Sequence, residues 1–134
     1  MTSFSLKIVT PDGMEFEGNA EELIVRTTTG DIGILAGHVD CVAPLGMGRA
    51  TVIIDGQKRY AACIGGMLSV SGGNVTLVPT TFEWADEIDA ARVEASYEKA
   101  QQMLRSGNAS DTDLRLAQAR LRRALVRKSV VSFK

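Results

Sequence analysis

Arginine side chains concentrated near the C-terminus are the residues of this sequence best suited to binding phosphates or acidic groups. From Leu114 to the end, the chain has seven basic residues and no acidic one. A guanidinium group carries paired N–H donors at fixed angles, and these match the oxygens of a phosphate or a carboxylate. Such a basic segment indicates an acidic protein partner or a phosphate ligand. Its arginines are Arg115, Arg120, Arg122, Arg123 and Arg127.

Residues for catalysis or metal binding are sparse by comparison. The single histidine, His38, has no serine or cysteine nucleophile motif beside it, and one histidine is too few for a histidine-based metal cluster. Cys41 and Cys63 are 22 residues apart, which fits reduced, buried thiols better than a disulfide framework or a zinc site. A hydrolase would need a catalytic triad or a metal-ligand spacing, and neither is convincing here. We therefore expect no catalytic residue, no metal site and no required cofactor.

The first 84 residues have the pattern of a small β-protein. Phe4, Leu6 and Ile8 alternate with their neighbours at a period of two, as in a half-buried strand. The pair Asp55-Gly56 separates strand-like runs over 51–54 and 57–63, and it signals a tight hairpin because both positions must tolerate positive φ. A second hairpin is expected at 71–74, between short strands over 68–70 and 75–78. Short strands with such frequent turns indicate a sandwich or barrel, and we predict an all-β N-terminal sandwich over residues 1–84.

The last 50 residues are predicted to form a C-terminal α-helical hairpin, because residues 85–134 contain no proline and only one glycine. Asp86 is expected to cap the first helix, with Asp89 in its first turn. Gly107 ends that helix, and a turn over 107–109 leads to an antiparallel second helix. The apolar stripes expected to pack together are Val93, Tyr97, Ala100 and Leu104 in the first helix, and Leu114, Ala117, Leu121 and Ala124 with Leu125 in the second.

Charge and packing both suggest that this hairpin is a movable unit. Residues 1–84 carry a net charge of −4, whereas residues 85–134 carry +3. Both apolar stripes are narrow and rich in alanine, so their burial stabilises only modestly, at about 25 cal/mol per Å² of apolar surface. Isolated helices of this length are marginal in water. We therefore expect that the hairpin can leave the sandwich, or open, at little cost.

Two motifs in the first half of the chain identify a family. Residues 8–13 have the sequence IVTPDG, and residues 30–38 have the sequence GDIGILAGH, in which three glycines bracket the apolar residues. Together they closely resemble the epsilon subunit of bacterial and chloroplast F-type ATP synthases, and the resemblance covers the whole chain. The family usually has proline where this chain has Ala36, and residues 39–47 also depart from its pattern. We expect the apolar residues Ile32, Ile34 and Leu35 to belong to the core.

The resemblance implies a non-catalytic central-stalk, or rotor, subunit. The family's epsilon subunit binds the gamma subunit and the ring of membrane c subunits, rotates with them, and couples ion flow to ATP synthesis. Asp31 and the loop up to His38 match the segment that meets the polar loops of the c-ring. Such a subunit is peripheral on the cytoplasmic face of the bacterial plasma membrane, or on the stromal face of the thylakoid.

The sequence itself gives no reason to expect direct membrane insertion. No apolar run approaches the roughly 20 residues that a membrane-spanning helix needs. The N-terminus has neither the basic region nor the apolar region of a signal peptide.

A second resemblance lies at the start of the predicted hairpin. Residues 88–93, IDAARV, resemble the motif by which some members of the family bind ATP on the folded hairpin. In that interpretation Asp89 and nearby backbone meet adenine, and Arg92 faces phosphate. This chain has Val93 where the motif has alanine, and Lys99 where a member with arginine holds phosphate. The residues that the resemblance assigns to an ATP site are Glu83, Ile88, Asp89, Arg92, Arg123 and Arg127.

The resemblance also implies a regulatory use for the basic helix. In the family the hairpin can extend along the gamma subunit, so that its second helix meets acidic segments of the catalytic alpha and beta subunits and blocks ATP hydrolysis. Charge complementarity would set this contact and salt would weaken it. The residues expected in this inhibitory contact are Arg115, Arg120, Arg122, Arg123 and Arg127. ATP bound to the compact form would oppose the extension.

Other interpretations of the same residues remain open. Asp89 can be a first-turn acid, and the arginines can form an ordinary solvated face. A free-standing nucleotide sensor would use Asp89 and Arg92 without any stalk. A nucleic-acid adaptor would use the basic helix, but residues 114–134 include one aromatic residue, Phe133, so stacking support is thin and no nucleic-acid partner is expected.

Overall fold

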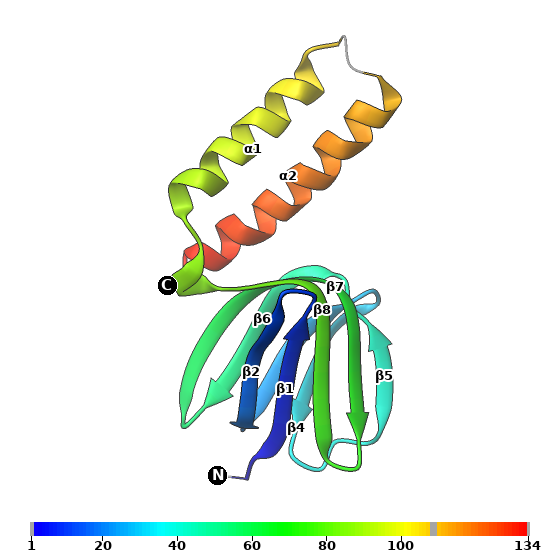
Figure 1. Ribbon diagram of the computed structural model, residues 1–134, viewed down its shortest axis with the longest axis vertical. Helices are drawn as coiled ribbons and strands as arrows, with labels where there is room; N and C mark the ends of the chain where they lie inside the picture. Colours follow the sequence, from blue (N-terminus) through cyan, green and yellow to red (C-terminus); the bar gives the residue numbers. More distant parts are fainter. Residues whose placement is uncertain (1, 108–109, 134) are drawn as a thin grey trace.

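The computed structural model describes residues 2–107 and 110–133, with the strands gathered at one end and the two α-helices at the other (Figure 1). The predicted N-terminal β-sandwich followed by a C-terminal helical hairpin is confirmed. The elements in chain order are β1 (Phe4–Thr10), β2 (Gly13–Ala20), β3 (Glu22–Thr27), β4 (Gly30–Leu35), β5 (Cys41–Pro44), β6 (Met47–Ile54), β7 (Gln57–Ser71), β8 (Asn74–Trp84), the 3-10 helix η1 (Ala85–Glu87), α1 (Ala90–Arg105) and α2 (Asp111–Val131).

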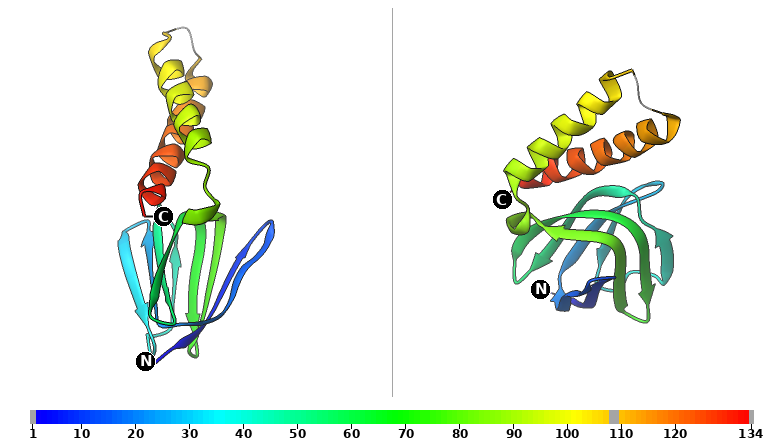
Figure 2. Two further views of the ribbon diagram at one scale, coloured as in Figure 1. Left: turned by 90° about the vertical axis from the view of Figure 1, so that its left-hand side faces the viewer. Right: turned by 45° about the horizontal axis from the view of Figure 1, so that its top comes forward.

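The strands form a sheet with the order β2-β1-β8-β7-β6-β3-β4, and β5 pairs separately with β7. The β1–β8 pair is parallel, and the other strand pairs are antiparallel. The sheet folds over on itself into two layers, which the turned view separates (Figure 2). Both predicted hairpins are present: Asp55 and Gly56 have φ of 51° and 77°, and Gly72 and Gly73 have φ of 56° and 82°.

One long strand replaces two short ones that the sequence predicts. The runs expected over 57–63 and 68–70 are parts of β7, whose first half pairs with β6 and whose second half pairs with β5. Gly66 lies between the two halves with φ of 103°, and a Cβ atom there would lie only 2.0 Å from the backbone oxygen of Val78. Glycine is therefore required where β8 runs so close beside β7.

The main core fills the space between the two layers. Phe4, Leu6 and Ile8 are buried as their alternation predicts. Of the three apolar residues expected in the core from the glycine-rich motif, Ile34 is fully buried and Ile32 is partly buried. Leu35 is 57% exposed, so its assignment to the core was wrong. The reason is the period of two: Leu35 follows the buried Ile34 on β4 and faces the other way.

The hairpin contains the two predicted helices, with one correction to the first cap. Asp89, rather than Asp86, caps α1, because its Oδ1 accepts hydrogen bonds from the backbone N–H groups of Ala91 and Arg92. Asp86 lies one turn earlier, inside η1. Ser110 caps α2, because its hydroxyl oxygen accepts a hydrogen bond from the backbone N–H of Asp113. The expected turn residues 108 and 109 lie outside the described part of the chain.

Alanines dominate the buried contact between α1 and α2. Ala100 of α1 and Ala117 and Ala124 of α2 are buried, whereas Leu125 is 47% exposed and does not belong to the seam. No helix within the ranges 2–107 and 110–133 is both long and apolar enough to cross a membrane.

A second, smaller cluster joins the hairpin to the sandwich. It consists of the buried residues Ala62, Ala85, Ile88, Val93 and Val130. Tyr60, Val126 and Val131 pack against it. The hairpin therefore stands on one end of the sandwich, touching it through the start of α1 and the C-terminal end of α2 (Figures 1 and 2).

Candidate functional site

A cavity of about 270 Å³ lies where β8, the start of α1 and the C-terminal half of α2 meet. It brings together five of the six residues predicted for an ATP site, namely Glu83, Ile88, Asp89, Arg92 and Arg127. Arg123, the sixth, does not line it, although it lies one helical turn from Arg127. The remaining lining residues are Glu87, Val93, Ser96 and Ala124.

The N-terminus of α1 forms one side of this cavity. Asp89 Oδ1 accepts from Ala91 N at 3.0 Å and from Arg92 N at 3.2 Å, so this carboxylate holds the first turn of the helix. Val93 lines the cavity, but its side chain is buried in the small cluster beneath the hairpin. Arg92 belongs to this first turn, and its exposed side chain also lines the cavity.

An ion pair across the cavity ties the hairpin to the sandwich. Arg127 Nε of α2 donates to Glu83 Oε1 of β8 at 2.6 Å. Both side chains are about two thirds buried, with exposed fractions of 28% and 32%, so the pair is less screened than a surface pair. This hydrogen bond uses one of the five N–H donors that a guanidinium carries, so Arg127 retains donors for an anion.

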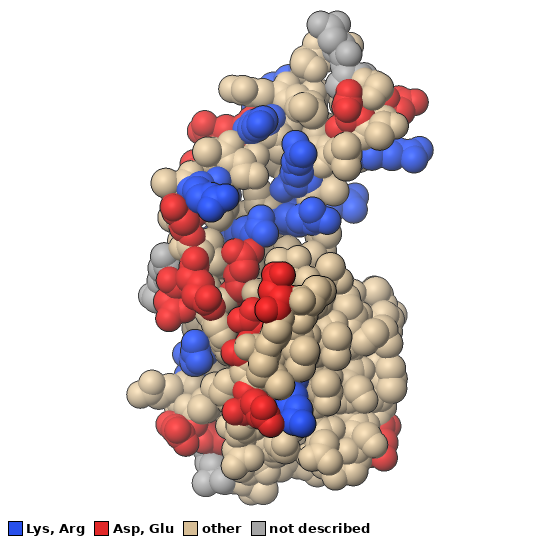
Figure 3. Space-filling model, in the orientation of Figure 1, with Lys and Arg blue, Asp and Glu red and all other residues tan. Residues whose placement is uncertain are grey.

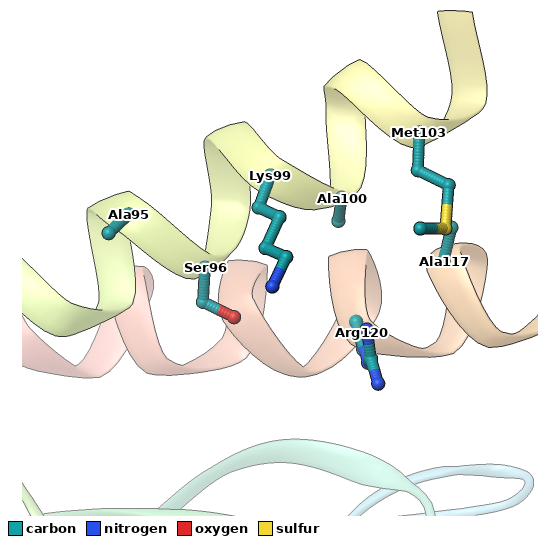
Figure 4. A pocket seen from close by; sticks show the side chains of 7 residues that line it. All are labelled: Ala95, Ser96, Lys99, Ala100, Met103, Ala117 and Arg120. Atoms are coloured by element: carbon teal, nitrogen blue, oxygen red, sulfur yellow. The ribbon is translucent and has the colours of Figure 1, made fainter. Parts of the chain in front are cut away.

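A second cavity, of about 360 Å³, lies between the two helices (Figure 4). Ser96 lines both cavities, so the two are adjacent. Lys99 extends from α1 toward α2, and Arg120 lies on the facing helix (Figure 4). Sequence reasoning did not single out Ser96. The signal was available, because Arg92, Ser96 and Lys99 follow the i, i+4, i+7 spacing of one helical face.

The basic side chains of α2 form a separate surface. Figure 3 shows Lys and Arg gathered over the hairpin, and Asp and Glu gathered where the hairpin meets the sandwich. Of the five arginines predicted for an inhibitory contact, Arg115, Arg120, Arg122 and Arg123 are exposed. Arg127 is the exception, because it is paired with Glu83. The hairpin is also held internally by the ion pair of Lys128 with Glu94, at 3.1 Å.

Asp31 and His38 do not lie together. Asp31 is next to the turn at the start of β4, where Arg26 Nε donates to it at 2.6 Å. This hydrogen bond, together with the charge of Asp31, raises the pKa of the Arg26 guanidinium above its ordinary value. His38 lies beyond the other end of β4, with its Nδ1 2.8 Å from the Val39 carbonyl oxygen. A six-residue strand spans about 20 Å, so the predicted segment is a strand with Asp31 and His38 at its two ends.

An uncharged face of the sandwich is the surface that sequence reasoning missed. Pro44, Met67 and Val78 lie directly opposite one another on β5, β7 and β8. Met67 is 43% exposed, Val78 is 45% exposed, and nearby Val42 is 67% exposed. Figure 3 shows this part of the sandwich without charged side chains. The signal in the sequence was the presence of apolar residues at the outward positions of strands whose inward positions are apolar too.

Comparison with known families covers nearly the whole chain. Residues 3–85 match the family model described as "ATP synthase, Delta/Epsilon chain, beta-sandwich domain". Residues 86–132 match the model described as "ATP synthase, Delta/Epsilon chain, long alpha-helix domain".

Curated relatives that resemble this chain over most of its length are named ATP synthase epsilon chains. The chain is 41% identical over 135 residues to the ATP synthase epsilon chain of Ruminococcus albus, covering 100% of both proteins. It is 39% identical over 130 residues to that of Bacillus velezensis, covering 97% of this chain and 98% of the relative. It is 41% identical over 115 residues to that of Bacillus subtilis, covering 86% of each.

Two solved structures share the fold. One is a chain of the Euglena gracilis mitochondrial ATP synthase, from a structure of OSCP, F1 and the c-ring, with a TM-score of 0.84 at 20% identity, covering 100% of this chain and 83% of that one. The other belongs to the central stalk and c-ring of the Tetrahymena thermophila mitochondrial ATP synthase, with a TM-score of 0.60 at 12% identity, covering 95% of each chain.

Proposed function

Since this chain belongs to the ATP synthase delta/epsilon family, we propose that it is a rotor subunit of the central stalk with a regulatory hairpin. Within that family it is an epsilon-type subunit of the F-type enzyme, and such a subunit is non-catalytic. It couples ion flow through the c-ring to ATP synthesis, and its hairpin restrains ATP hydrolysis. It works as a peripheral protein on the cytoplasmic face of the membrane, within the complex. The observation that carries the proposal is the division of the surface into an uncharged sheet face and a basic hairpin (Figure 3).

The uncharged face suits a permanent protein partner. Exposed apolar side chains that lie side by side on a sheet usually mark an interaction surface. Met67, Val78 and Val42 provide such a surface on β7, β8 and β5. We assign it to the gamma subunit, the partner that must turn with this chain. Asp31 and His38 are assigned to contacts with gamma or the c-ring from the two ends of β4.

The basic hairpin suits a reversible contact with the catalytic subunits. Arg115, Arg122 and Arg123 are exposed and have no carboxylate partner among the ion pairs of the described residues. Long-range attraction between these cations and acidic segments of alpha and beta would guide the helix and would weaken as salt increases. Arg120 belongs to the same contact. Arg127 joins it only after its ion pair with Glu83 breaks.

The cavity at the start of α1 suits regulation by ATP. Arg92 and Arg127 offer guanidinium donors to phosphates, and Asp89 with the adjacent backbone and Ile88 offers contacts to adenine. Because the cavity is built from both the hairpin and the sandwich, a ligand in it would stabilise the compact form selectively. Arg123 would reach such a ligand only from outside the cavity lining.

The proposal is tested by ATP hydrolysis of the assembled enzyme with full-length chain or with a chain lacking residues 88–134. We expect the shortened chain to assemble and to raise the hydrolysis rate severalfold, and we expect the difference to shrink as ATP increases. R115Q/R122Q should also relieve inhibition, whereas the matched variant Arg105→Gln on α1 should not. Unchanged or lower hydrolysis after deletion would show that this hairpin is not inhibitory.

A free-standing nucleotide sensor is the alternative that the cavity favours. It would bind ATP through the same residues but would need no stalk partner. Co-purification of the full-length chain with a gamma-type subunit separates the two functions, because a sensor would stay alone. Replacing Met67 and Val78 with serine should abolish co-purification if the uncharged face binds gamma.

A further inference from the structure

The C-terminal end of α2 is held on the sandwich by a contact outside the nucleotide cavity. The Phe133 ring centroid lies 4.9 Å from that of Tyr60, with the two planes tilted by 39°. The guanidinium carbon of Arg49 lies 4.1 Å from the centroid of Phe133 and 5.5 Å from that of Tyr60. One cation therefore contacts both rings at distances typical of cation–π interaction.

The local structure explains why these three side chains meet. Val130 is fully buried against the sandwich, and the N–H of Phe133 donates to its carbonyl oxygen at 2.9 Å. This turn brings Phe133 to the side of α2 that faces the strands. Arg49 of β6 lies opposite Ala62 of β7, a residue of the small cluster, and Tyr60 precedes Ala62 by two positions and so points to the same face.

The contact of Phe133 with Tyr60 and Arg49 is more specific in geometry than the alanine seam between the helices. Aromatic and cation–π contacts depend on geometry, and each changes an equilibrium by a factor of several. Among the described residues, Arg49 takes part in no ion pair, so its guanidinium is committed to the two rings. None of the three residues lines the nucleotide cavity. The contact therefore acts on hairpin release independently of ATP.

We propose that Phe133, Tyr60 and Arg49 form a latch that sets the fraction of molecules whose hairpin has left the sandwich. The inference rests on the proposed function in one respect, namely that the hairpin moves. The latch lies just beyond the C-terminal end of α2. Once it opens, the cluster around Val130 and the Glu83–Arg127 ion pair still hold α2 on the sandwich.

The test is the rate at which trypsin cleaves α2 in the isolated full-length chain without nucleotide. A released hairpin is cleaved because its helices are marginal on their own, and when reclosing is fast the rate follows the released fraction. We expect Phe133→Ala and Arg49→Met each to raise the rate about 5- to 30-fold. Phe133→Leu, which keeps apolar bulk without a ring, should fall between wild type and Phe133→Ala. Leu116→Ala, at an exposed position of the same helix, should change the rate less than about twofold.

A double-mutant cycle separates the latch from a general loss of stability. Because Phe133 and Arg49 share one contact, the double variant should be cleaved little faster than either single variant. Thermal unfolding of the sandwich, followed by its strand signal, should stay unchanged in all variants. Wild-type cleavage rates, or fully additive effects, would overturn the latch.

These outcomes are distinct from the failure of the proposed function. If deletion of residues 88–134 leaves ATP hydrolysis unchanged while the cleavage rates shift as expected, the latch stands and the inhibitory role fails. If hydrolysis rises but the latch variants behave as wild type, the latch fails alone.

Discussion

Cys63 on β7 places an ionisable thiol inside the main core, with 4% of its surface exposed. Burial raises the pKa of this thiol to about 12, compared with an ordinary value of 9.0. The unfolded chain therefore loses this proton from about pH 9, whereas the folded chain keeps it until about pH 12. Since the native state binds more protons in this interval, the free energy of unfolding must fall as pH rises, and it is fully maintained below pH 9.

The size of this effect is measurable. Between pH 9 and 12 the Cys63 contribution should fall by up to about 1.4 kcal/mol per pH unit. Denaturant unfolding of wild type and Cys63→Ala from pH 7 to 11 isolates it, because other titrating groups are common to both proteins. The alanine variant is less stable at pH 7 by a constant cavity cost, and we expect the gap to narrow above pH 9. Parallel curves would contradict the prediction.

Gly66 lies at a position where the backbone leaves no space for a side chain. Its φ of 103° is unfavourable for a side chain, and an added Cβ would lie 2.0 Å from the Val78 oxygen. We expect Gly66→Ala to destabilise the sandwich by at least about 2 kcal/mol, because backbone strain and a clash with main chain act together. Gly33→Ala is the matched control in a strand, with no atom within 4 Å of its added Cβ and no positive φ. Thermal melting should show a large loss for the first variant and almost none for the second.

At the scale of the helix, Asp89 has two roles that different substitutions can separate. Its side chain caps α1, and the proposed function also gives its carboxylate a place beside a bound nucleotide. Asp89→Ala removes both, and we expect it to weaken α1 by about 1 kcal/mol. Asp89→Asn keeps a capping oxygen but removes the charge, so the helix should be retained.

Calorimetric titration with Mg-ATP, alongside hydrogen exchange of residues 90–93, distinguishes the two roles. If the carboxylate contacts the nucleotide, Asp89→Asn should lose affinity while the exchange of α1 stays that of wild type. Arg92→Ala should also lose affinity. Arg122→Ala, an exposed arginine of α2 outside the cavity, serves as the control and should bind as wild type. Absence of heat with wild type at millimolar ATP would remove the nucleotide site altogether.

At the scale of elements, the sequence predicted what local pattern determines. The period of two gave the strands, and Asp55-Gly56 gave a turn with positive φ at both positions. Local pattern gave the wrong boundaries where contacts with distant segments determine them. Two separate strands were expected on either side of residues 64–67, but pairing with β8 continues through this stretch and makes it part of β7. The cap of the first helix was predicted at Asp86, but α1 is capped by Asp89, because Ala85 at the start of η1 and Ile88 just after it are buried against the sandwich.

The candidate site shows the same limit. Most residues of the IDAARV motif gather because they share one helical turn, which sequence can predict. The partner of Arg127 is Glu83, 44 residues earlier, and only the packing of α2 against β8 brings the two together. The same packing decides that Arg127 lines the cavity and Arg123 does not. The uncharged face is likewise assembled from three strands, so no single stretch of sequence displays it.

Most of the buried hydrophobic side chains of residues 2–107 and 110–133 belong to two clusters of very unequal size. The main core contains 18 buried residues, all between Phe4 and Trp84, whereas the cluster beneath the hairpin contains five. Val93 and Val130 of that smaller cluster belong to α1 and α2, and no residue of either helix belongs to the main core. The sandwich should therefore hold its structure when the hairpin leaves, which is the physical requirement for a regulatory arm.

Truncation after Glu87 tests this requirement directly. Residues 1–87 keep every member of the main core and lose the contacts of Tyr60 and Ala62 with α2, and Glu83 loses its ion pair. Losing about 1 kcal/mol would lower the melting temperature of a domain of this size by about 4–8 °C. We expect the fragment to unfold cooperatively within about 10 °C of the full chain, while a peptide of residues 88–134 alone shows little helix. A fragment without a cooperative transition would mean that the hairpin is part of the sandwich's own stability. In that case, dissociation of the hairpin toward the catalytic subunits would unfold the sandwich and so break its contact with the rotor. Neither a regulatory hairpin nor a latch that controls its release would then be possible.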